Sequence, residues 1–288
     1  MYSSGAVAGI AIGCTIASVV IVSAVFLLVQ RVHRRPPNLN PIPLSMRVLD
    51  YLPQGMGHKE LRQEFSQLET QIKTYVVNFF HDRPVHATTV NADKLLAMLG
   101  GADDHSSNQW STQLCDTSNN NRSIALRMYI ARVLWARVDP RGVPDTTLLP
   151  VEVIHCYQAA LLENRDNNWP PLLDYWRAMT AFVLASQYPR DRLAEGDPRT
   201  DNIKRTVAGL LDALQPFRVE GAERSVHILE NVITDFAVLG FKIFSHINPT
   251  EVAWPPSSAA QVVLFPTLKQ YRLDDGRRLM TIKEASCS

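Results

Sequence analysis

The pair His155 and Cys156 is the part of this sequence that most resembles a nucleophile beside its base. Adjacent residues on a helix point about 100° apart, so these two side chains are poorly placed to act on the same atom. A core cysteine beside a surface histidine explains the pair better. The chain contains no G-x-S-x-G elbow, no Walker phosphate loop and no G-x-G-x-x-G or H-E-x-x-H motif. No catalytic residue is therefore assigned, and the sequence leaves open whether the protein is an enzyme.

Two further dipeptides could take part in metal chemistry. His81-Asp82 matches a dipeptide of metal-dependent phosphohydrolases, which need more histidines and an aspartate from other helices. The chain has no histidine pair at i, i+4 that would complete such a site. A polar helix end explains the dipeptide at least as well. Asp103-Asp104 lacks the later carboxylate that the aspartate-rich helix of a prenyl or terpene synthase supplies for magnesium. The sequence therefore predicts no metal site and no cofactor.

Four arginines recur every five residues, at Arg122, Arg127, Arg132 and Arg137. Five steps of about 100° turn each arginine about 140° from the previous one, so they scatter around a helix instead of forming a basic stripe. We expect them to snorkel or to pair with acids on neighbouring helices. The net charge of +1, from 29 basic and 28 acidic residues, gives no global field for nucleic acid. Nucleic acid is therefore not an expected partner.

Aromatic residues offer a different kind of site. A pocket between helices could be lined by Trp135, Tyr157, Tyr175 and Trp176, and it would suit a lipophilic ligand. The alternative is that these four side chains pack in the hydrophobic core, as most aromatic side chains do.

The N-terminal segment is typical of a membrane anchor. From residue 5 to residue 29 the chain has no charge and no proline. As a helix rising about 1.5 Å per residue, this segment is long enough to cross a hydrocarbon layer of about 30 Å. We expect a transmembrane helix at about residues 6 to 30, within an anchor region of residues 1 to 35. The leader and the flank differ from those of a cleaved signal peptide. The prediction is a single-pass membrane protein.

The orientation follows from the charges that flank this segment. Arg31, Arg34 and Arg35 follow it, whereas only the α-amino group precedes it. By the positive-inside rule these arginines stop transfer and place the following domain in the cytosol. Asn121 begins an N-x-S sequon, which would be glycosylated only in a lumenal or extracellular domain. A lumenal glycoprotein is therefore the alternative that the sequon can report.

Small residues recur every four positions in the anchor, at Gly5, Gly9, Gly13 and Ala17. They line one face on which a second helix could pack closely, so the membrane segment could form a homodimer. The alternative is that glycine and alanine are simply frequent in membrane helices.

The remaining chain divides by composition. Residues 36 to 58 are rich in proline and predict a semi-rigid spacer. Residues 59 to 250 predict an irregular multi-helix domain, in which the polar stretch 102 to 121 forms a mobile loop. The clearest helix, over residues 59 to 80, has its apolar residues at 3-and-4 spacing: Leu61, Phe65, Leu68, Ile72, Val76 and Phe79. Further helices are expected at 92–99, 123–138, 151–165, 171–187, 201–215 and 222–246.

The last segment, residues 251 to 288, predicts extended chain instead of helix. Two β-like runs flank Asp275-Gly276, a dipeptide typical of a tight hairpin turn. The predicted fold class is therefore all-α: an N-terminal transmembrane helix, a proline-rich spacer and an irregular helical domain that ends in a small C-terminal β-hairpin.

The C-terminal runs Ala253-Trp254-Pro255, VLFPTL at 263 to 268 and Asp274-Asp275-Gly276 resemble the endings of uncharacterised fungal single-pass membrane proteins. Some of those proteins are encoded near secondary-metabolite gene clusters. The resemblance covers the C-terminal motif and implies no activity and no functional residue.

Two functions fit these observations. The first is a membrane-anchored helical adaptor or scaffold that binds an unidentified protein partner, because the helical domain carries few motifs. The alternative is a membrane-tethered accessory enzyme in lipophilic secondary-metabolite biosynthesis, with the aromatic pocket as its site.

Overall fold

The computed structural model describes residues 56–100, 107–118, 121–163, 170–221, 223–246, 248, 250–255, 262–272 and 278–287. All of these lie in one compact unit, Asp50–Ser288. The predicted anchor and nearly all of the spacer lie outside them. So do the proposed packing face and the stop-transfer residues: Gly5, Gly9, Gly13, Ala17, Arg31, Arg34 and Arg35.

The predicted fold class, an all-α chain with a spanning helix, is corrected by this structure. Among the described residues, none of the helices combines the length and the apolar character that a bilayer crossing needs. The description of the protein as a single-pass, all-α membrane protein is therefore wrong for this part of the chain. What the structure shows is a mostly helical domain with strands in two small antiparallel sheets.

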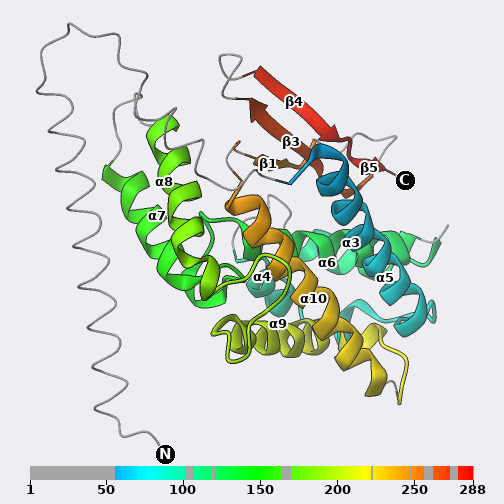
Figure 1. The fold of residues 1–288 in the computed structure, drawn as a ribbon. Helices are drawn as coiled ribbons and strands as arrows, with labels where there is room; N and C mark the ends of the chain where they lie inside the picture. Colours follow the sequence, from blue (N-terminus) through cyan, green and yellow to red (C-terminus); the bar gives the residue numbers. More distant parts are fainter. Residues whose placement is uncertain are drawn as a thin grey trace, which may run out of the picture. The chain divides into compact units, whose positions relative to one another are not determined.

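Helices form most of the described chain (Figure 1). The α-helices are α3 (His58–Phe79), α4 (Ala92–Leu99), α5 (Ser107–Cys115), α6 (Asn121–Val138), α7 (Val151–Glu163), α8 (Pro170–Val183), α9 (Arg199–Ala213) and α10 (Glu223–Phe244). Short 3-10 turns lie at Ala87–Thr89, Pro144–Thr146, Leu184–Ser186 and Gln215–Phe217. The prediction of a mobile loop over residues 102 to 121 is wrong in part, because α5 forms inside this stretch. Trp110 and Leu114 of α5 are buried, and their burial stabilises a helix with weak periodicity.

The main core lies between α3, α6 and α10. The 3-and-4 spacing predicted for α3 is confirmed for five of its six residues, since Leu61, Phe65, Leu68, Ile72 and Val76 are buried, whereas Phe79 is half-buried. Helix α6 is central: twelve of its eighteen residues are buried, which explains why its apolar residues show no single stripe.

Helices α7 and α8 pack on a second, smaller hydrophobic cluster at the C-terminal half of α10. The buried members of this cluster are Leu149, Val153, Ile154, Ala181, Tyr188, Phe241 and Phe244. Helix α10 thus contributes to both clusters, because Phe236 and Ala237 belong to the main core.

The strands form two small antiparallel sheets. One has the order β1 (Thr250–Ala253), β3 (Thr267–Arg272) and β4 (Arg278–Lys283). The other pairs β2 (Val263–Phe265) with β5 (Ser286–Cys287). The β3–β4 pair agrees with the predicted hairpin, and its register places Arg272 opposite Arg278. The buried side chains Phe265, Leu268 and Ile282 join the main core, so the sheets are packed against the helices instead of being a free appendage.

Candidate ligand-binding site

A cavity of about 460 Å³ lies where the C-terminal ends of α6 and α10 meet α7, α8 and β1. Its charged lining residues are Arg132, Asp139, Arg141, Arg177 and Glu251. The lining also includes the aromatic side chains Trp135, Tyr157, Phe244 and Trp254. Below, "the lining arginines" means Arg132, Arg141 and Arg177.

Helix geometry explains how α6 and α10 present these side chains to the cavity. Arg132, Trp135, Ala136 and Asp139 follow one another at 3-and-4 spacing, so they occupy one face at the end of α6. Gly240, Ile243 and Phe244 repeat the same spacing on α10.

Gly240 also sets the distance between the two helices at this wall. A β-carbon at position 240 would lie 2.5 Å from Cγ1 of Val138 and 2.7 Å from its Cβ. The close approach of α10 to the end of α6 therefore requires glycine at this position.

The lining arginines are held by different partners. The guanidinium carbon of Arg132 lies 4.6 Å from the ring centre of Trp254, a cation–π distance. Arg141 forms a two-point contact with Asp139, with Nη2 2.8 Å from Oδ2 and Nε 3.0 Å from Oδ1. This contact, first through its hydrogen bonds and then through the carboxylate charge, raises the pKa of Arg141 above its usual value.

Arg177 caps the C-terminal end of α10. Its Nη1 donates to the carbonyls of Ile243, at 3.2 Å, and of Phe244, while Nη2 donates to the carbonyl of His246 at 2.8 Å. These are carbonyls at a helix end, where the last helical turn has no partner of its own. Arg177 therefore joins α8 to the end of α10 and contributes a fixed positive charge to the cavity wall.

The aromatic residues predicted to line a pocket divide into two groups. Trp135 and Tyr157 do line the cavity. Trp176 lies behind Tyr157, with 6.5 Å between ring centres, and supports it from the second cluster. The side chain of Tyr175 is outside the described part of α8.

Trp135 connects the cavity to the main core. Its ring stacks on Phe65 at 5.0 Å and meets Phe236 edge-on at 5.1 Å. The Trp135 Nε1 atom is shielded from solvent and has no hydrogen-bond partner among the described residues. A buried donor without a partner costs free energy.

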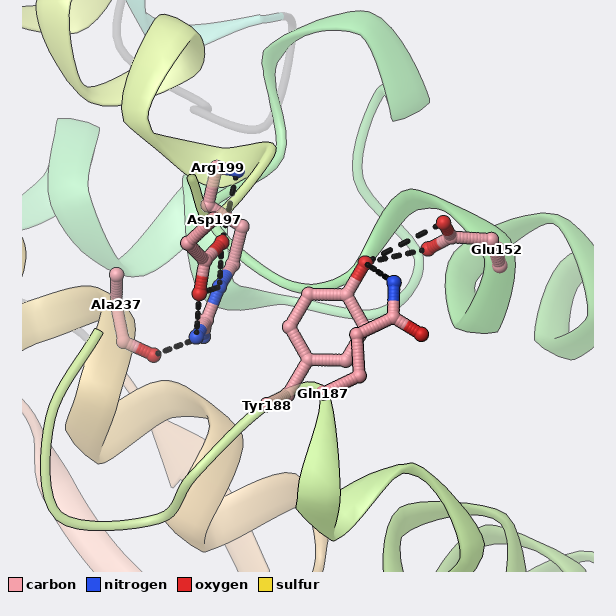
Figure 2. Close-up of polar contacts among 6 residues, drawn as sticks. All are labelled: Glu152, Gln187, Tyr188, Asp197, Arg199 and Ala237. Atoms are coloured by element: carbon pink, nitrogen blue, oxygen red, sulfur yellow. Dashed lines mark hydrogen bonds and ion pairs between the residues drawn. The ribbon is translucent and has the colours of Figure 1, made fainter. Parts of the chain in front are cut away.

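Two sets of polar contacts join the segment after α8 to α7 and to α10 (Figure 2). Asp197 binds Arg199 with 2.7 Å between Oδ2 and Nη2, and Nη1 of Arg199 donates to the carbonyl of Ala237 at 3.3 Å. The Tyr188 hydroxyl donates to the carboxylate of Glu152 on α7, at 3.1 Å from Oε2. These contacts hold the segment after α8 against α7 and α10.

The other residues considered for chemistry lie apart from the cavity. His81 and Asp82 follow the end of α3 in irregular chain. His155 and Cys156 are both exposed on α7, so the expectation of a core cysteine is wrong. The residues that the structure describes contain no group of three or more histidine, cysteine, aspartate or glutamate side chains that could hold a metal ion. Asp103 and Asp104 are outside the described residues.

The four evenly spaced arginines of α6 scatter as predicted, but two of them do not pair with acids. Arg122 is completely buried and donates to backbone carbonyls of Leu114, Cys115, His81 and Arg83. Arg137 donates to the carbonyls of Thr146 and Met98. A buried arginine that satisfies carbonyls cannot be recognised from spacing, because those carbonyls belong to distant segments.

Asn121 of the glycosylation sequon is the first residue of α6. Its Nδ2 donates to Oδ2 of Asp116 at 2.7 Å and to Oγ of Ser118 at 3.2 Å. The amide nitrogen that a glycan would occupy therefore already takes part in a polar cluster before the helix.

Searches for similar proteins returned no match. Neither a protein-family model, nor a curated protein, nor a solved structure matches this chain.

Proposed function

We propose that the helical domain is a binding module, and that its cavity takes a small organic anion with a flat aromatic body, such as an aromatic carboxylate. One observation supports this proposal: the lining arginines and the aromatic rings of Trp135, Tyr157 and Trp254 line the same cavity.

The chemistry of the lining suits such a ligand. A guanidinium group attracts a carboxylate through its charge, and it also stacks on flat rings. Aromatic walls contact a flat apolar body over a large area at low cost in side-chain entropy. The volume of about 460 Å³ lies within the range of about 300 to 1,000 Å³ that is usual for small-molecule pockets.

The charge balance of the cavity favours an anion. Three arginines line it, against the carboxylates of Asp139 and Glu251. The Asp139 carboxylate is held by the two-point contact with Arg141, at the exposed side of the cavity. Three lining groups could exchange a proton with a ligand: Asp139, Glu251 and Tyr157. The three arginines together with Trp135 and Trp254 outnumber them. This composition supports binding as the first proposal and turnover as its competitor.

Isothermal titration calorimetry on the full chain tests the proposal with a matched pair of probes, naphthalene carboxylate and naphthalene carboxamide. We expect the carboxylate to bind at least about tenfold more tightly, a difference of about 1.4 kcal/mol. Arg141→Gln should remove this preference, because it takes one positive charge out of the cavity lining. The Arg141 side chain is 70% exposed, so the change should not disturb the core. Arg224→Gln, at an exposed position near the start of α10, is the control and should keep it.

Three results would contradict the proposal: no binding of either probe, equal binding of acid and amide, or a preference that survives Arg141→Gln. Chemical conversion of a bound probe would favour the enzymatic alternative over a binding module.

A further inference from the structure

A chain of side-chain hydrogen bonds joins α3, β3 and the residues after α10. His58 Nε2 lies 2.6 Å from Oε1 of Gln270, and Nε2 of Gln270 lies 3.3 Å from Nδ1 of His246. His246 is 5% exposed and Gln270 is 0% exposed. Polar groups buried to this degree depend on their partners, so a change in the protonation of His246 must rearrange the chain.

The contacts of His246 fix which of its nitrogens carries the proton. The backbone N–H of Asn248, which can only donate, lies 3.1 Å from Nδ1. The carbonyl oxygen of Met56, which can only accept, lies 3.0 Å from Nε2. The ring is therefore neutral, with its proton on Nε2, and Nδ1 accepts from both Asn248 and Gln270.

A second proton on Nδ1 would have no acceptor. It would face the N–H groups of Asn248 and Gln270, and turning the Gln270 amide would satisfy only one of these conflicts. The charged groups acting on the ring are His58 from α3 and Arg177 from α8, and both disfavour a positive charge. Burial is the largest cause that lowers the pKa of His246, and these two groups add to it.

This histidine is placed to act on the cavity. Asn248 lies two residues before β1, and Thr250, Glu251 and Val252 of β1 line the cavity. On the other side, the carbonyl of His246 accepts from Arg177, one of the lining arginines. His246 thus contacts two parts of the cavity wall: its ring accepts from the Asn248 N–H before β1, and its backbone carbonyl accepts from Arg177.

We infer that His246 is a pH-sensitive support of the β1 wall, and that its protonation releases the Asn248 N–H and loosens β1. The effect on β1 stands by itself. Its consequence, weaker ligand binding in acid, rests on the proposed function.

The direction with pH follows from proton linkage. An ordinary histidine titrates near about pH 6.5, and the folded state lowers this value for His246, so the released state binds the proton more tightly. The closed wall is therefore fully favoured above about pH 6.5 and loses stability as the pH falls below it. The opening equilibrium should rise by up to about tenfold per pH unit until the folded-state pKa is reached.

Nitrogen-15 NMR of the full chain tests both parts of the inference. Ring spectra should show His246 neutral with its proton on Nε2, and it should titrate below the ordinary histidine value of about pH 6.5. Hydrogen exchange of the amides of Asn248 and β1, corrected for the intrinsic effect of pH, should accelerate as the pH falls from about 7.5 to about 5.

His246→Asn supplies the matched variant. Its Oδ1 can take the place of Nδ1 as acceptor and does not titrate, so exchange in β1 should lose its pH dependence. His227→Asn, at an exposed position on α10, should keep the wild-type pH dependence. The inference is overturned if His246 titrates at about pH 6.5 or above, or if His246→Asn leaves the pH dependence of β1 unchanged. Failure of the naphthalene probes to bind at any pH would count against the proposed function and leave these NMR results standing.

Discussion

Asp197 and Arg199 form an ion pair of 2.7 Å with side chains that are 0% and 2% exposed, although they stand in one of the most polar stretches of the sequence. The guanidinium also lies 5.1 Å from the ring centre of Tyr188 and 5.6 Å from that of Phe241. An aromatic enclosure of this kind removes water from both charges. Each partner therefore depends on the other for its stability.

Removing one member of this pair should be strongly destabilising. Asp197→Asn is expected to lower the free energy of unfolding by about 3 to 5 kcal/mol, because it leaves a buried guanidinium without its counter-charge. Urea denaturation measures the change. Asp212→Asn breaks the surface pair of Asp212 with Lys94, which has the same 2.7 Å separation, and should cost less than about 1 kcal/mol. Equal losses for the two variants would show that burial does not control the strength of the pair.

Arg122 should be a second point of high sensitivity. Its side chain satisfies four backbone carbonyls at the end of α5 and after α3, so Arg122→Met leaves several buried acceptors without donors. We expect a loss of at least about 3 kcal/mol in urea denaturation. Arg122→Lys should recover only part of it, because an ammonium group lacks the wide planar fork of a guanidinium. Arg83→Met, at an exposed position, is the control and should change stability by less than about 0.5 kcal/mol.

Gly240 should be intolerant of even one methyl group. Gly240→Ala would place a β-carbon 2.5 Å from Cγ1 of Val138, and we expect the overpacking to cost about 1 to 3 kcal/mol. Val138→Ala should relieve the clash, so the double variant should lose less stability than the sum of the two single variants. Thermal or urea denaturation of the four variants of this double-mutant cycle should give a coupling free energy of at least about 1 kcal/mol. Additive losses would contradict the close approach of α6 and α10.

Asp116 should resist protonation. Hydrogen bonds from the hydroxyl of Ser118, the side chain of Asn121 and the backbone of Ser118 lower its pKa to about 2. Because the folded-state pKa is lowered, its contribution to stability is present above about pH 4 and is lost as the pH falls toward about 2. Carbon-13 NMR of the carboxyl group measures the titration. Ser118→Ala should raise the pKa toward the ordinary value, whereas Thr117→Ala, at the exposed neighbouring position, should not.

Periodicity explains the part of the fold that the sequence could predict. The bounds of α4 agree with the prediction, and α3 differs by one residue at each end. Both helices have one apolar face against the core, so their patterns are simple. Tyr75 was not among the residues of the predicted apolar face, yet it is buried on α3.

Long-range contacts explain what the sequence could not predict. Asp197 and Arg199 stand in a polar run, and charge alone gave no sign that both side chains are buried. Part of the cavity could be predicted, because the aromatic residues Trp135 and Tyr157 suggested a pocket. Its arginines and its β1 wall could not be predicted, because they come together only when α6, α8 and residues 250 to 254 meet in space.

The division of the core into two clusters that share α10 gives the domain a natural line of local unfolding. The cluster beneath α7 and α8 is the smaller one, and Phe241 and Phe244 attach it to the same helix whose Phe236 belongs to the main core. The α7–α8 pair can therefore separate as a cooperative unit at a lower free energy than global unfolding. Since this pair forms one side of the cavity, such breathing would give a molecule passage to the interior while the main core stays folded.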